Sequence, residues 1–103
     1  MINNKIYVFD IDGTICTNTN GLYQNALPYE DVIKKINILY DSGNVIKMMT
    51  ARGSTTGTDW TTLTEKQLRQ WGVKYHELIM NMKPHADIFV DDKAINVASF
   101  RLL

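Results

Sequence analysis

Short apolar segments alternate with helical patterns along this chain, and the alternation is the strongest constraint on its fold. Runs rich in β-forming residues predict strands over residues 5–9, 45–49, 77–81 and 86–90. Apolar residues at helical spacing predict helices over residues 28–41, 61–71 and 93–100. Strands that alternate with helices imply right-handed crossovers and a parallel sheet. We therefore predict an α/β fold.

The composition is that of one ordinary globular domain, which we expect to span residues 1–103. Lys and Arg together number 11, as do Asp and Glu, so the formal net charge is zero. This balance argues against long nucleic acids and anionic membranes as partners, since a basic face is their usual footprint. Cys16 is the single cysteine, which excludes an internal disulfide and cysteine-based zinc or redox motifs.

The N-terminal region lacks a signal-peptide pattern, because Asp10 and Asp12 fall where an apolar core is needed. No apolar run approaches the ~18 residues that a membrane-spanning helix requires. We therefore expect a cytoplasmic protein without a membrane segment.

Polar side chains follow three of the predicted strands. Asp10 and Asp12 come directly after the first strand, and Thr50 ends the second. Asp91 and Asp92 follow the fourth. The carboxyl ends of parallel strands meet at one edge of the sheet, where open α/β sheets bind their ligands. We therefore expect these side chains to lie close together.

The two acidic pairs predict a metal site at that edge. Asp10 and Asp12 are two residues apart in an extended segment, so they project to the same side and repel each other without a cation. Four carboxylates in one crevice are hard oxygen ligands that suit Mg²⁺ rather than zinc. The alternative is that Asp10 and Asp12 are turn residues before Gly13, but the second acidic pair favours the metal site.

Thr50 and Lys83 each have an ordinary explanation, the first as a turn or cap residue and the second as a surface lysine. The positions of these two residues in the sequence suggest a second explanation. Lys83 lies shortly before the fourth predicted strand, close to the acidic edge where Thr50 ends. A hydroxyl group and an ammonium group at that edge suit the oxygens of a phosphoryl group.

The motifs and their order resemble those of the haloacid dehalogenase superfamily of phosphohydrolases. The segment at 10–14 has its DxDGT pattern, Thr50 matches its strand-end threonine, Lys83 its lysine, and the pair at 91–92 its acidic motif. The resemblance covers nearly the whole chain. It implies a three-layer, Rossmann-like parallel sheet with helices on both faces, and a Mg²⁺-dependent phosphomonoester hydrolase.

The resemblance assigns catalytic roles to the carboxylates. Asp10 is the nucleophile that forms an aspartyl-phosphate, and Asp12 is the general acid and then the general base. Mg²⁺ is held by the Asp10 carboxylate, the Asp12 backbone carbonyl and Asp92. Asp91 then acts through a water or orients the site. Asn96 stands where many relatives have a further aspartate.

Phosphate binding falls, by the same resemblance, to Thr50, Lys83 and the backbone amides near Ile11 and Ala51. Arg52 follows this threonine motif and is a candidate for a second anionic group of the substrate. A salt bridge at a loop is an equally good interpretation of Arg52.

The gaps at 15–27 and 51–82 are too short for the cap domain of many relatives, so we expect an open site that a neighbouring subunit would cover. Short capless relatives occur in capsule and surface-polysaccharide gene clusters, which favours a sugar phosphate or related metabolite as substrate. One alternative is a polynucleotide 3′-phosphatase, suggested by the Thr-Ala-Arg-Gly segment at 50–53, although the zero net charge argues against it. Another is a non-catalytic phosphate-binding domain.

Several further side chains have only general expectations. Tyr23 would lie at the tip of a small flap formed by residues 15–27. We expect Trp60 in the core, although it could also stack on a sugar or base. We expect His85 in a solvated loop and Cys16 as a small buried hydrophobic residue. The methionines of the strands are expected in the core: Met48, Met49, Met80 and Met82.

Overall fold

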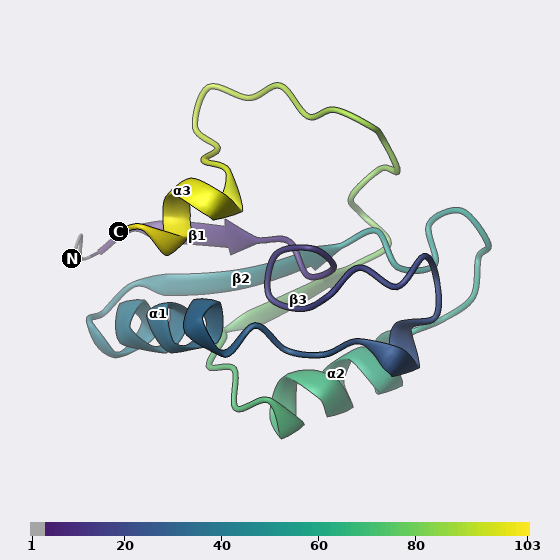
Figure 1. Cartoon of the computed structure of the whole chain (residues 1–103), viewed down its shortest axis with the longest axis horizontal. Coiled ribbons are helices and arrows are strands. Elements are labelled where there is room, and N and C mark those ends of the chain that lie inside the picture. Colours follow the sequence, from purple (N-terminus) through teal and green to yellow (C-terminus); the bar gives the residue numbers. More distant parts are fainter. Residues whose placement is uncertain (1–3) are drawn as a thin grey trace.

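The structure is a computed structural model that describes residues 4–103. Three parallel strands form its sheet in the order β1-β2-β3: β1 (Ile6–Phe9), β2 (Val45–Thr50) and β3 (Glu77–Met80). Its helices are α1 (Glu30–Asp41), α2 (Thr61–Gln70), α3 (Val97–Arg101) and the short 3-10 helix η1 (Tyr23–Asn25). Figure 1 shows the chain alternating between the sheet and α1 and α2. The predicted α/β fold with a parallel sheet is confirmed.

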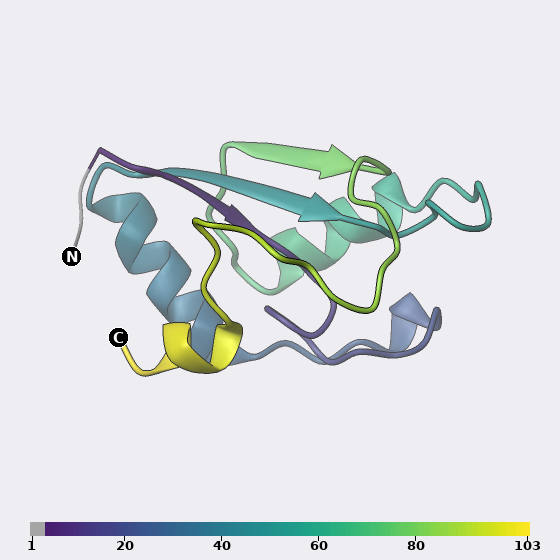
Figure 2. The ribbon, with the colours of Figure 1, turned by 90° about the horizontal axis from the view of Figure 1, so that it is seen from above.

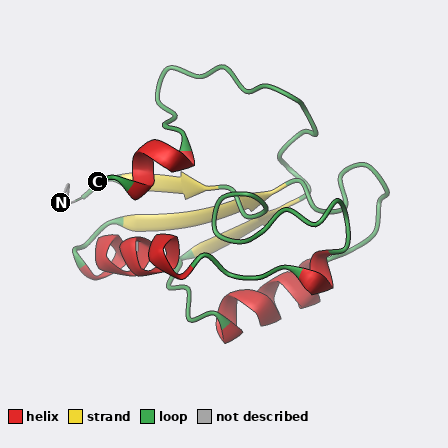
Figure 3. Ribbon diagram, viewed as in Figure 1, coloured by secondary structure: helices red, strands yellow, loops and turns green. Residues whose placement is uncertain are grey.

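The register of the sheet brings the ends of β1 and β2 together. Phe9 pairs with Met48, and Thr50 pairs with Met80. Asp10, directly after β1, therefore leaves the sheet near the end of β2. Because all three strands run the same way, their carboxyl ends share one edge (Figure 3).

The core lies between one face of the sheet and α1. Buried side chains of the helix recur at the predicted spacing and pack with Phe9, Ile46 and Met48 of the strands; those of α1 are Val32, Ile33, Ile36 and Leu39. The helix ends where predicted, with Gly43 at a φ of +94° directly after the Ser42 cap. A positive φ at this position closes many helices and favours glycine.

The arrangement of layers differs from the expected one. Figure 2 places α1 and α2 on the same side of the sheet, so the described residues form two layers rather than three. The other face carries Ile6, Val8 and the ion pair of Lys47 and Glu77, whose Nζ and Oε2 lie 3.4 Å apart. Ile6 and Val8 are exposed on that face, because within residues 4–103 no helix covers it.

The predicted fourth strand is wrong in this structure. Residues 86–90 form no strand, and Ile88 and Val90 are 79% and 93% exposed. They belong to a long loop, residues 81–96, that arches away from β1 (Figure 1). The reason is the connection. A parallel crossover takes about a dozen residues or more, and only residues 81–85 separate β3 from the predicted strand.

The last helix is shorter than predicted. It begins after Asn96, whose side-chain oxygen accepts a hydrogen bond of 2.8 Å from the amide of Ala98. Asparagine is a favoured N-cap residue, so this start had a local signal in the sequence.

The burial of the methionines also differs in part from the prediction, since Met48 is buried but Met82 is exposed. Among the described helices, none is long and apolar enough to cross a membrane.

Candidate functional site

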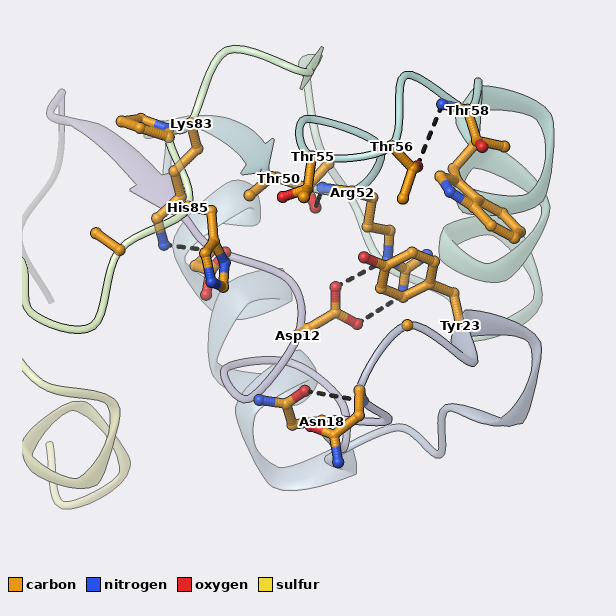
Figure 4. Close-up of a pocket in the computed structure, with 18 of the residues that line it drawn as sticks. Asp12, Asn18, Tyr23, Thr50, Arg52, Thr55, Thr56, Thr58, Lys83 and His85 are labelled. Atoms are coloured by element: carbon orange, nitrogen blue, oxygen red, sulfur yellow. Dashed lines mark hydrogen bonds and ion pairs between the residues drawn. The ribbon is translucent and has the colours of Figure 1, made fainter.

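A pocket of about 610 Å³ opens at the carboxyl end of the sheet. Its walls come from four segments: the loop after β1, the region around η1, the loop between β2 and α2, and the loop after β3. Figure 4 shows Lys83 and His85 on one side of this pocket and Tyr23 and Thr58 on the other. The prediction that the strand ends form the candidate site is therefore met for β1 and β2.

Asp10 and Asp12 are aimed by a tight turn after β1. Ile11 between them is buried, which leaves the two aspartates to line the pocket. Gly13 has a φ of +82°, and its amide donates to the carbonyl of Cys16 over 2.8 Å. Ile15 is also buried and anchors the end of the turn. The DxDGT segment thus forms a short turn whose apolar residues enter the core while its carboxylates face the pocket.

Lys83 lies at the acidic edge, as predicted, and there it pairs with Asp10. Its Nζ is 3.1 Å from Oδ1 of Asp10, and both side chains are partly exposed in the pocket. The hydroxyl of Thr14 donates to the other oxygen of Asp10 over 3.5 Å. The ammonium also lies 4.6 Å from the centre of the Phe89 ring. The site therefore has a carboxylate and a cation side by side at its mouth, and both are accessible to a ligand.

Arg52 pairs with Asp12 instead of facing the pocket as a free cation. Nε donates to Oδ2 over 3.0 Å and Nη2 donates to Oδ1 over 2.9 Å, as the dashed lines in Figure 4 show. Nη1 donates to Thr64 and Gln67 of α2 over 3.0 and 2.6 Å. The guanidinium of Arg52 is buried and engaged, which favours the second of its two interpretations over contact with an anionic group of the substrate. The alternative, a salt bridge, is what the chain forms.

Thr50 is buried at the end of β2, and its Oγ1 accepts a hydrogen bond of 3.1 Å from the amide of Arg52. This bond turns the chain out of the strand and supports the simpler of its two interpretations. Thr50 and the half-buried Ala51 also line the pocket. Their predicted contact with phosphoryl oxygens stays a prediction.

Asp91 and Asp92 lie away from the other carboxylates. Both are exposed in the loop of residues 81–96, and neither lines the pocket. The Asp91 carboxylate accepts a hydrogen bond of 2.7 Å from the amide of Lys93, and this bond lowers the pKa of Asp91 below its ordinary value. Their expected place beside Asp10 required the fourth strand. Without that strand the loop directs them elsewhere.

The side chains as placed do not fit a Mg²⁺ site. Across residues 4–103, no three side chains of His, Cys, Asp or Glu lie close enough together to hold an ion. Asp10 faces the ammonium of Lys83, and Asp12 faces the guanidinium of Arg52. Each of these carboxylates therefore already has a cation as its neighbour.

A polar wall of the pocket escaped the sequence analysis. Hydroxyl and amide side chains line it: Asn18, Asn20, Thr55, Thr56 and Thr58. Tyr23 and Trp60 meet edge to face beside this wall, with ring centres 5.1 Å apart. Trp60 is half-buried at the pocket rather than within the core. The density of threonine and asparagine in the two loops after β1 and β2 is the signal that points to this wall.

Gly53 closes the loop that carries the threonines. Its φ is +83°, and a Cβ atom there would lie 2.1 Å from the carbonyl oxygen of Thr58. Only glycine fits so close an approach of two backbone segments.

His85 is exposed at the rim of the pocket, which confirms its expected place in a solvated loop.

Cys16 lies beneath the aspartate pair and is fully buried. Burial, with a further contribution from the nearby charge of Asp12, raises the pKa of the Cys16 thiol to about 12. The thiol is therefore protonated at neutral pH, and the reactive thiolate is scarce. Its predicted role as a buried packing residue is confirmed.

Comparisons with known proteins give information on the fold of the chain and none on its activity. Neither a family model nor a curated protein matches the chain. The chain is similar to a target protein from Vibrio cholerae whose crystal structure has been solved, with 25% identity and a TM-score of 0.85. The match covers 96% of this chain and 89% of that protein. The likeness supports the α/β fold and carries no activity.

Proposed function

We propose that this chain is a phosphomonoester hydrolase with Asp10 as its nucleophile. The observation that carries the proposal is the pair of Asp10 and Lys83, whose charged atoms lie 3.1 Å apart at the mouth of the pocket. Phosphoryl transfer needs an aligned nucleophile and positive charge for the phosphoryl oxygens. Asp10 supplies the first and Lys83 the second. Asp12 lies in the same turn as the candidate acid and base.

The proposed reaction has two steps. An oxygen of Asp10 attacks phosphorus, the bond from phosphorus to the ester oxygen breaks, and a protonated Asp12 gives its proton to the leaving alcohol. Water then attacks the aspartyl-phosphate while Asp12 takes a proton from it. The bond between phosphorus and Asp10 breaks, which releases phosphate and restores both aspartates. Lys83 offsets negative charge on the phosphoryl oxygens in both steps.

The polar wall favours a substrate whose part beyond the phosphate is small and uncharged. A sugar phosphate or a related metabolite of polysaccharide biosynthesis has such a part. Threonine and asparagine side chains offer donors and acceptors for hydroxyl groups, and the Tyr23–Trp60 pair offers an apolar surface. Arg52 is engaged with Asp12, so it does not serve a second phosphate. This and the zero net charge argue against the alternative, a polynucleotide 3′-phosphatase, which needs cations along a nucleic-acid backbone. The other alternative, a non-catalytic phosphate-binding domain, would share the pocket without turnover.

Dependence on Mg²⁺ is part of the proposal and has a structural requirement. Residues 81–96 would have to move so that Asp91 or Asp92 approaches Asp10. The third layer of the expected fold would need a helix on the second face of the sheet, which none of the described helices supplies. We also propose that a second copy of the chain covers the open site. We propose the cytoplasm as the compartment.

The test uses the purified chain with and without Mg²⁺ on three groups of compounds: aryl phosphates, sugar phosphates and 3′-phosphorylated oligonucleotides. We expect release of phosphate from the first two groups and its loss in Asp10→Asn. Oxygen-18 from solvent water should appear in the released phosphate, which separates hydrolysis from transfer to another alcohol. The absence of turnover under both metal conditions would overturn the enzymatic proposal and favour the binding domain.

A further inference from the structure

The guanidinium of Arg52 uses all of its donors inside the protein. Besides its two bonds to Asp12 and two to α2, Nη2 approaches Sγ of Cys16 at 4.0 Å. An arginine has five N–H groups in a rigid plane, so this set leaves none for a ligand. The ring of Tyr23 covers the guanidinium, with its centre 4.7 Å from Cζ. Arg52 therefore acts on other residues of the site rather than on a bound molecule.

The partners of Arg52 hold it from the side opposite Asp12. Thr64 and Gln67 are both buried on α2, and both accept hydrogen bonds from Nη1. Gln67 also donates over 2.7 Å to the carbonyl of Tyr23, in the flap. The guanidinium thus joins α2, the flap and the turn that carries Asp12. A helix and a planar side chain together determine where the Asp12 carboxylate lies.

We propose that Arg52 is a positioning residue for Asp12, an inference that rests on the proposed function. The planar fork of the guanidinium gives one hydrogen bond to each oxygen of Asp12, so it sets both the position and the plane of the carboxylate. Oδ2 of Asp12 accepts only this one bond and keeps lone-pair capacity for a proton or a water, whereas Oδ1 also accepts a hydrogen bond of 3.7 Å from Sγ of Cys16. Asp12 lines the pocket, so this capacity is available to the ester oxygen and to water. A lysine at this position would supply the positive charge, but it would not fix the plane of the Asp12 carboxylate.

The proposal predicts an effect that depends on the leaving group. Nitrophenolate leaves a phosphate ester readily without a proton, whereas an alkyl alcohol needs one in the transition state. A misplaced Asp12 should therefore slow phosphoryl transfer to Asp10, the step that kcat/KM reports, far more from an alkyl phosphate than from p-nitrophenyl phosphate. Its effect on the later attack of water is the same for both esters. A general loss of folded protein would slow both equally. Loss of a substrate-binding cation would raise KM for both.

The experiment compares Arg52→Lys with Arg101→Lys on p-nitrophenyl phosphate and on a glycerol phosphate. Arg101 is a matched control, because it also pairs with an aspartate through two bonds but lies outside the pocket. For Arg52→Lys we expect kcat/KM to fall about 10²-fold on the glycerol phosphate and less than about tenfold on the nitrophenyl ester, because kcat/KM does not include the later attack of water. Arg101→Lys should leave both rates unchanged.

A second variant, Thr64→Val, keeps Arg52 and the shape of the helix but removes one acceptor of Nη1. It should show the same preference with a smaller loss, even if Arg52→Lys fails to fold. Circular dichroism and thermal melting establish which variants are folded. Equal losses of kcat/KM on both esters in folded variants, or a rise in KM alone, would overturn the positioning role while leaving the phosphatase proposal intact. Absence of turnover by the unmodified chain would overturn the proposed function itself, and this role with it.

Discussion

Two arginine–aspartate pairs in this protein have nearly the same geometry and different surroundings. Arg52 donates to Asp12 over 3.0 and 2.9 Å, and Arg101 donates to Asp31 over 2.9 and 3.1 Å. Each guanidinium also lies over a tyrosine ring, at 4.7 and 4.5 Å. The first pair joins the pocket to α2, whereas the second joins α3 to α1 at the surface.

Exposure separates the two pairs. The side chain of Arg52 is 0% exposed and that of Arg101 is 37% exposed, while their aspartates are 18% and 57% exposed. Water competes for the groups of the exposed pair, so such pairs contribute little to stability. A buried pair that loses one member leaves the other without the partner that offset its desolvation. The same two bonds therefore have different consequences, and the partners beyond the pair decide which.

The largest difference should appear in stability. Arg52→Met removes the cation beside Asp12 and the donor to Thr64 and Gln67, and should lower the free energy of unfolding by about 3 kcal/mol. Arg101→Met should lower it much less, because its partner is solvated. Urea unfolding followed by circular dichroism measures both. Equal losses in the two variants would show that burial does not distinguish the pairs.

Cysteine reactivity gives a second way to compare the pairs. Cys16 has a pKa of about 12, which leaves a thiolate fraction of about 10⁻⁴ at pH 8 and makes alkylation slow. Arg52 lies against Cys16 and its charge lowers the thiol pKa, so Arg52→Met should raise that pKa further and slow alkylation by iodoacetamide while the thiol stays packed. Arg101→Met should not change the rate. Mass spectrometry of the folded variants over time measures the modification, and a faster rate in Arg52→Met would show that the packing around the thiol has opened.

Salt should affect the pairs differently and more weakly. Exposed charges are screened at high ionic strength, whereas a pair removed from water is screened much less. The stability difference between the unmodified chain and Arg101→Met should therefore shrink between low and high salt. The difference for Arg52→Met should persist. A loss that is equally sensitive to salt at both sites would mean that the Arg52 pair is as hydrated as the surface pair.

The smallest expected effect is the loss of the stability contribution of the Arg101–Asp31 pair at acid pH. The hydrogen bond from Arg101 lowers the pKa of Asp31 below its ordinary value of 3.8. The folded state thus favours ionised Asp31, so the contribution is fully present above that ordinary value and is lost as the pH falls through the lowered one. The difference in unfolding midpoint between the unmodified chain and Arg101→Gln should be constant from pH 5 to 7 and should shrink below about pH 4. A difference that grows in acid would contradict this assignment.

Local patterns were sufficient for most of the elements. The strands β1, β2 and β3 and the helices α1 and α2 follow from apolar residues at spacings of two or of three and four, which depend on neighbouring residues alone. The rule that parallel strands end at a common edge placed Asp10 near Thr50. Lys83 was expected near that edge because of the fourth strand, which does not form, and its pairing with Asp10 is seen only in the structure. Residues 86–90 have an equally good strand pattern, but a strand also needs an edge and a connection that reaches it.

The sequence by itself determined the parallel α/β architecture and the place of Asp10, because periodicity and strand direction are local properties of the chain. Only the tertiary structure decided the role of Arg52 and the position of Asp91 and Asp92. A guanidinium binds whatever acceptors surround it, and those of Arg52 come from a turn 40 residues before it and a helix 12 to 15 residues after it. Which side chains meet over such separations depends on how the elements pack.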